Sequence, residues 1–72
     1  KDETQYEIIA HVDKEKFEYF KLVLRKDKIV GCAMLGHLKD PILIKRAIDE
    51  EVDITKHKHR LLDIEFDWEE ML

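Results

Sequence analysis

The sequence predicts an α+β fold: a small three-stranded antiparallel sheet with two or three short helices on one face. Two neighbouring segments, 17–26 and 29–36, are strongly apolar and are separated by a short charged turn, which is typical of a β-hairpin. Asp40-Pro41 then opens a segment with apolar residues at helical spacing. The shorter alternating segment 6–12 supplies a third strand, and 72 residues suffice for one domain near the lower size limit.

The predicted hairpin is apolar on both of its faces. Phe17, Tyr19 and Val23 fall on one face of the segment 17–26, and its other apolar residues, Phe20, Leu22 and Leu24, fall on the opposite one. A soluble monomer seldom leaves such a surface bare, so one face is expected to line the core and the other to meet a partner. The turn is placed at 26–28, with Lys28 where glycine is usual, which predicts a strained or a longer turn.

The helices are expected in the second half of the chain. Asp40 is the predicted N-cap of a helix over 41–51, with Pro41 in its first position and an apolar stripe of Ile44, Ala47, Ile48 and Val52. Thr55 is expected to cap a second helix over 56–62, and Asp67 to cap a last one after an extended segment 64–68. Residues 1–5 are expected to be a linker remnant, and 6–72 a single domain.

Composition excludes several classes of function. The formal net charge is −4, and basic residues are mixed with acidic ones, so a nucleic-acid partner is not expected. No apolar run is long enough to cross a bilayer, and no signal peptide is visible. A single cysteine forms no internal disulfide, so a cytoplasmic location is expected. The chain begins at Lys1, which we interpret as an excised domain.

No catalytic, cofactor-binding or metal-binding residue is predicted. His57 and His59 are two residues apart, a spacing that points two helical side chains in different directions, so surface positions are favoured over a metal site. Cys32 lies among apolar residues and is expected to be an inert core residue. Gly31 and Gly36 lack the Lys-Ser/Thr ending of a phosphate loop; a bulge or close packing is expected at Gly31, and a strand end at Gly36.

Two candidate interaction surfaces remain. The first is the hairpin together with the terminal tryptophan, and the expected interface residues are Phe20, Leu22, Leu24, Val30, Cys32, Met34 and Trp68. The second is the acidic cluster of Asp49, Glu50, Glu51 and Asp53, which is either a solvated face or a docking patch for a basic partner. The alternative function is therefore a free-standing acidic protein-interaction module.

The order of elements from Tyr19 onward resembles a known family. Tyr19, Lys21 and 22–24 (Leu-Val-Leu), the charged turn 26–28, Val30-Gly31, Gly36, Asp40 and the helix 44–48 follow one another as in the small C-terminal domain of FAD-dependent pyridine nucleotide-disulfide oxidoreductases, in the branch of NADH:rubredoxin and nitrite reductases. Lys28, Cys32 and Pro41 depart from that pattern, which has no catalytic position in this segment.

The resemblance implies a non-catalytic C-terminal accessory domain. The parent chain would be an oxidoreductase that uses FAD and NAD(P)H, both bound outside these 72 residues. Its own FAD and NAD domains are the implied partners, with a homodimer contact or an electron-acceptor protein as further candidates. The domain would then contribute to a dimer surface or to an acceptor-docking surface.

Overall fold

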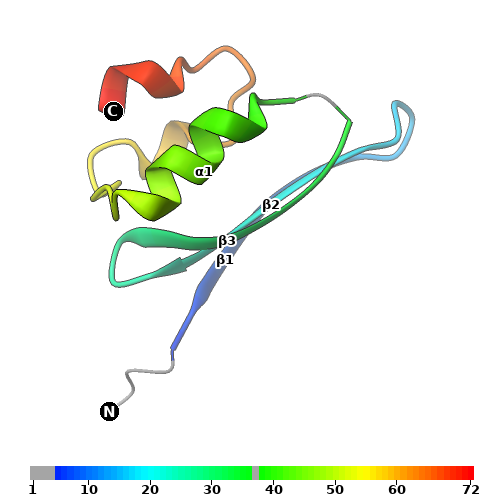
Figure 1. Cartoon of the computed structure of the whole chain (residues 1–72). Helices are drawn as coiled ribbons and strands as arrows, with labels where there is room; N and C mark the ends of the chain where they lie inside the picture. The colour runs from blue at the N-terminus through cyan, green and yellow to red at the C-terminus, as the bar shows by residue number, and fades with distance from the viewer. Residues whose placement is uncertain (1–4, 37) are drawn as a thin grey trace.

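The computed structural model describes residues 5–36 and 38–72, and Figure 1 shows their arrangement. Three strands come first: β1 (Glu7–Asp13), β2 (Glu18–Arg25) and β3 (Lys28–Leu35). One helix follows, α1 (Pro41–Asp49), and then two 3-10 turns, η1 (Lys58–Arg60) and η2 (Trp68–Met71). The predicted linker remnant lies mostly outside the described residues, since only Gln5 of that segment is described.

The sheet is antiparallel with the order β1-β2-β3, as the sequence predicts. In β2, Phe20, Leu22 and Leu24 alternate with Tyr19, Lys21, Val23 and Arg25. The first three side chains are 0–1 % exposed, whereas the other four are half-buried. Because side chains on a strand alternate between faces, β2 defines a core face and an outer face of the whole sheet.

The β2–β3 turn has two residues, Lys26 and Asp27, with φ values of 55° and 62°. Two consecutive left-handed residues are the requirement of the two-residue hairpin turn whose twist matches the strands. Neither residue is glycine, so the predicted strain is present, but its second position is Asp27 and not Lys28. Aspartate tolerates this conformation better than most residues, which explains why the turn forms without glycine.

A register shift interrupts the hairpin near Gly31. Val23 lies opposite Gly31 and Leu24 opposite Ile29, so Val30 is an extra residue on β3. This is a β-bulge, one of the two roles expected for Gly31. Gly36 has a φ of +94° and follows the last residue of β3, so it ends the strand as predicted.

Helix α1 begins as the sequence predicts. Asp40 Oδ1 accepts a hydrogen bond from the backbone N–H of Ile42 at 2.9 Å, and Pro41 occupies the first helical position. Ile44 and Ala47 of the predicted stripe are buried, while Ile48 and Val52 are partly buried against the core. The helix therefore covers the core face of the sheet, beside β3 (Figure 1).

The C-terminal segment, residues 53–72, differs from the prediction. The expected second helix is a set of turns that contains only η1, and the last predicted helix is the short η2. Asp53 organises the first turn, because its Oδ1 accepts from both the N–H and the hydroxyl of Thr55, which is therefore not a helix cap. Asp67 does cap η2 and accepts from the N–H of Glu69 at 2.9 Å.

The C-terminal segment nevertheless completes the core. It contributes four buried side chains, Ile54, Leu61, Phe66 and Trp68, and Trp68 packs near Phe20 with ring centroids 6.4 Å apart. Lys39 holds this segment from the loop before α1, since its Nζ donates to the carbonyl oxygens of Ile64 and Phe66. In Figure 1 α1 and both 3-10 turns lie on the same side of the sheet.

Candidate functional site

The outer face of the sheet is the main unexplained surface of the chain. Its members follow from the strand register: Ile8, Ala10 and Val12 on β1, Tyr19, Lys21, Val23 and Arg25 on β2, and Lys28, Gly31, Ala33 and Leu35 on β3. Ile8, Val12 and Leu35 are 60, 56 and 59 % exposed. Among the described residues no helix or turn lies on this side of the sheet (Figure 1). Large apolar side chains gathered on one face mark an interaction surface.

The charge on this outer face is of one sign. Lys21 lies in the central row, between Ala10 on β1 and Ala33 on β3, and Arg25 lies on the same face of β2 near the hairpin turn. The face contains no Asp or Glu, although the whole chain carries a net charge of −4. The Nε atom of Arg25 is buried and has no hydrogen-bond partner within 5–36 and 38–72. A surface that covers this face must therefore offer acceptors.

The structure places most of the expected interface residues elsewhere. Phe20, Leu22, Leu24 and Trp68 are at most 1 % exposed, and Met34 is half-buried against the same core. Phe20, Leu22, Leu24 and Met34 lie on the sheet face that α1 and the C-terminal segment cover, and Trp68 belongs to that covering segment, so all five have little surface left for a partner. Val30 and Cys32 are exposed on β3.

Cys32 is not the core residue that the sequence suggests. It lies opposite Leu22 in the register but on an edge strand, where its side chain stays exposed. Partial burial raises the pKa of the Cys32 thiol, which keeps the thiol protonated and weakens it as a nucleophile.

The histidines are dispersed. His11 lies 3.7 Å from Glu18, across β1 and β2. His57 stacks on Phe66 with ring centroids 5.4 Å apart, and the guanidinium of Arg60 lies over the same ring. His59 is exposed, and His37 lies outside the described residues. In the described part of the chain no three His, Cys, Asp or Glu side chains are placed to hold a metal ion.

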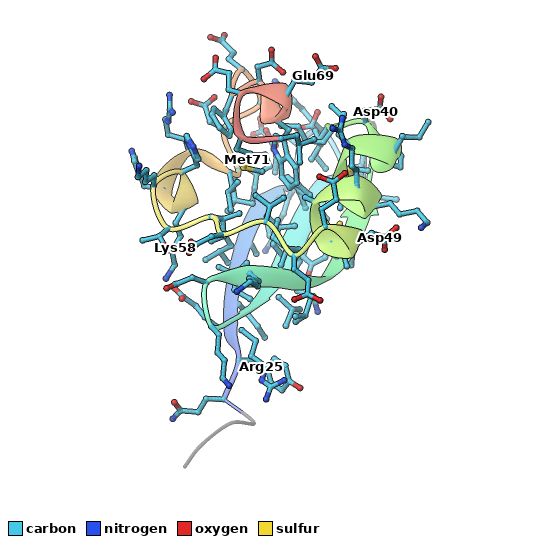
Figure 2. The ribbon with its side chains drawn as sticks, turned by 60° about the vertical axis from the view of Figure 1, so that its left-hand side comes forward. Arg25, Asp40, Asp49, Lys58, Glu69 and Met71 are labelled. Atoms are coloured by element: carbon cyan, nitrogen blue, oxygen red, sulfur yellow. The ribbon has the colours of Figure 1, made fainter. Side chains whose placement is uncertain are left out.

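The acidic cluster is largely paired within the chain. Asp49 accepts from Lys45 at 2.5 Å, and Glu50 accepts from Arg46 at 3.0 Å, each one helical turn away. The hydrogen bonds from Thr55, with smaller help from Lys28 and Lys56, lower the pKa of Asp53. Figure 2 shows Asp49 at the end of α1 and Arg25 at the hairpin end of the sheet, whereas Glu51 of the acidic cluster lines the same hollow as Arg25.

Two shallow hollows of about 450 Å³ each lie beside the β2–β3 turn, and Arg25 and Lys26 line both. Among the described residues, neither hollow is lined by Cys, Ser, Thr or His. No helix within the described residues is long and apolar enough to span a membrane.

The pattern of the rubredoxin NAD+ reductase C-terminal domain family matches residues 1–52. The chain belongs to this family. The matched part contains the sheet and α1, and the C-terminal segment lies beyond it. No curated protein and no solved structure matches the chain.

This family membership confirms the resemblance read from Tyr19 onward, and the rubredoxin NAD+ reductase family is an oxidoreductase family. Sequence reasoning identified the family and an apolar two-sided hairpin, but it missed Lys21, Arg25 and the exposed residues Ile8, Val12 and Leu35 as one surface. The signal was present in the alternation, since all five have the opposite parity to the core residues within their strands.

Proposed function

We propose that this chain is a non-catalytic accessory domain of an FAD-dependent NAD(P)H oxidoreductase. The outer face of its sheet would be the surface that joins it to the flavin-binding part of the same enzyme. Family membership supports the oxidoreductase setting, because the family is a C-terminal domain of a reductase. The cofactors would bind outside these residues.

The observation that carries the proposal is the uncovered apolar outer face. Its three most exposed large side chains, Ile8, Val12 and Leu35, lie on both outer strands. The opposite face of the same sheet is covered by the chain's own helix and C-terminal segment. A permanent neighbour is favoured over a transient one, because a bare apolar sheet face is an aggregation hazard between encounters.

Charge indicates what kind of surface covers the outer face. Two copies packed face to face would oppose Lys21 and Arg25 of one copy with the same cations of the other, and neither face supplies an acid. Burying unpaired charges is costly, so such a homodimer is disfavoured. A different surface that offers carboxylates or carbonyl oxygens satisfies both cations.

The acidic-module alternative gains no support from the geometry. Asp49 and Glu50 already pair with Lys45 and Arg46, and Asp53 is engaged by Thr55. A basic partner would have to compete with these contacts for the carboxylates.

The first test is the visible absorption spectrum of the full-length gene product before and after anaerobic NADH. A flavin spectrum that NADH bleaches is expected. A colourless product that binds no FAD would refute the oxidoreductase assignment.

The second test compares Ile8→Lys with Ile42→Lys in the full-length protein. Both side chains are exposed, at 60 and 73 %, but only Ile8 lies on the outer face, whereas Ile42 lies on α1. Ile8→Lys is expected to loosen the domain and to speed limited proteolysis before β1, with the flavin retained. Equal proteolysis of the two variants would argue against the outer face. An intact assembly with slower electron transfer to the acceptor protein would instead assign this face to acceptor docking.

A further inference from the structure

The free edge of β3 is unprotected along most of its length. β3 pairs only with β2 within the sheet, and residues 29–35 (Ile-Val-Gly-Cys-Ala-Met-Leu) include no charged residue and no proline. In the described structure no backbone hydrogen bond from outside the ladder with β2 reaches these residues, and only Lys28 at the start of the strand forms a bridge, with Asp53. Natural proteins usually guard such edges with charges, prolines or covering segments, because an open edge is a template for another strand.

The other edge of the sheet is guarded. β1 carries Glu7, His11 and Asp13, and the side chain of Glu7 is bonded to Lys58 of the C-terminal segment. This hydrogen bond raises the pKa of Lys58. The two edges of one small sheet therefore differ, and β3 is the edge that is open to strand addition.

From this contrast we infer that β3 pairs with β3 of a second copy, antiparallel across a two-fold axis, to form one six-stranded sheet. The regular part of the edge begins after the bulge at Val30 and runs over 31–35. A two-fold axis at its middle residue places Ala33 opposite Ala33, Cys32 opposite Met34, and Gly31 opposite Leu35 of the second copy.

This register is self-complementary. All of the paired residues are uncharged; Lys28 on the same strand lies beyond the paired segment, and Lys21 lies one strand away, opposite Ala33. The bulky Leu35 of one copy covers the bare Gly31 of the other, which supplies a cross-strand contact where the glycine has no side chain. Closed two-fold symmetry is also the commonest arrangement of soluble oligomers, and a two-fold pair of edges leaves no further open β3 edge.

The inference deepens the proposed function, on which it rests for the flavin-binding part that covers the outer face. An axis perpendicular to the sheet keeps the two outer faces on the same side, so the flavin-binding parts of two enzymes could still cover them. Strand pairing over five residues buries less than the roughly 1,200 Å² of a stable interface, so the isolated chain should dimerise reversibly and weakly.

The test needs only the 72-residue chain and no flavin, which separates it from the tests of the proposed function. Sedimentation equilibrium up to about 1 mM protein is expected to show a concentration-dependent dimer with a Kd of about 1 mM or tighter. A monomer throughout this range would refute the inference.

Two matched variants locate the contact. Ala33 and Ala10 are both exposed on the outer face, and both lie directly opposite Lys21, so a lysine at either position meets the same neighbour. Ala33→Lys places like charges on the dimer axis and is expected to give a monomer with an unchanged circular dichroism spectrum. Ala10→Lys lies two strands away and is expected to leave the dimer intact. Loss of the dimer in both variants, or in neither, would overturn the edge contact.

Disulfide trapping then tests the register. Ala33→Cys in a Cys32→Ala background should cross-link fastest under mild oxidation, because residues directly opposite lie within disulfide range. Native Cys32 should cross-link more slowly, since the register places it diagonal to the Cys32 of the other copy. His11→Cys in the same background, on the guarded edge, should not cross-link above the rate of random collision. Equal rates at the three positions would refute the β3 pairing.

Discussion

The two faces of the sheet are built from alternate residues of the same three strands, yet they have different surroundings. Leu22 is fully buried beneath α1 and the C-terminal segment, while its sequence neighbour Val23 faces outward on a surface that no described element covers. Both faces are apolar. Apolar content alone therefore shows that both faces of the sheet must be covered. Which face the chain covers itself depends on where α1 and the C-terminal segment pack.

The family match covers only part of the chain that lies over the core face. It extends over the sheet and α1 and stops at Val52, before the four buried side chains of the C-terminal segment. The cover of the core face is therefore made of two parts, the helix that lies within the family pattern and a segment that lies beyond it.

Ending the chain at Val52 should give the largest effect. The variant loses Ile54, Leu61, Phe66 and Trp68 together, which exposes Phe20 and Leu22 on the core face. Loss of cooperative folding is expected, because a domain of this size has only a few kcal/mol of stability to lose. Amide dispersion in proton NMR and thermal circular dichroism measure it. A cooperative melt of residues 1–52 would show that α1 alone suffices as a cover.

The next prediction compares the stability loss caused by one alanine substitution on each face of the sheet. Leu22→Ala should lower the free energy of unfolding by about 2–5 kcal/mol, because it leaves a cavity in the core. Ile8→Ala should change it by about 0.5 kcal/mol or less in the isolated chain, since the side chain is already exposed. Urea unfolding of both variants provides the measurement. Equal losses would mean that the outer face is packed in solution.

Lys39→Met tests the contact that holds the C-terminal segment. Lys39 Nζ donates to the carbonyls of Ile64 and Phe66, and burial lowers its pKa while Asp63 and Asp67 partly oppose that shift. Loss of these hydrogen bonds should cost about 1 kcal/mol, discounted for partial exposure. Lys45→Met is the control, because its exposed pair with Asp49 should contribute about 0.3–0.5 kcal/mol. Urea unfolding compares the free energies of unfolding of the two variants. Equal losses would mean that Lys39 does not hold the C-terminal segment in place.

The smallest expected effect is on the loss of folding stability at low pH. The hydrogen bonds from Thr55 lower the pKa of Asp53 below its ordinary value of 3.8, so this carboxylate favours the folded state above about pH 4. That contribution should disappear as pH falls through the folded-state pKa. Unfolding measured from pH 6 to pH 2 should therefore show a shallower acid loss for Asp53→Asn than for the native chain. Parallel curves would mean that Asp53 titrates alike in both states.

Much of the fold is predictable from local pattern. The alternation in β2, the Asp40-Pro41 helix start and the apolar stripe of α1 are each specified within a few residues. The three strands and the first helix are accordingly confirmed. The segment after Val52 contains no sustained helical period, and its turns depend on side-chain acceptors such as Asp53 and on distant contacts such as Lys39.

The candidate site was less predictable, because alternate residues of a strand lie on opposite faces of the sheet. Choosing the wrong face therefore exchanges every core residue for an interface residue. The sequence shows that the hairpin has two apolar sides, but it does not show which side α1 will cover. The sequence predicts Phe20, Leu22 and Leu24 as interface residues, whereas the structure places them in the core. The prediction that Cys32 is a core residue was wrong for a related reason. Its side chain points to the core face of the sheet, but it lies on an edge strand and stays exposed.

The packing of Trp68 against Phe20 has a consequence for how folding can be observed. Trp68 is the only tryptophan, and its neighbour lies far away in the sequence, in the second strand. Tryptophan fluorescence therefore reports the closing of a long loop of the domain, whereas far-ultraviolet dichroism reports the early local hairpin. A delay between the two signals during refolding would measure the time that the chain spends as an open, half-covered sheet.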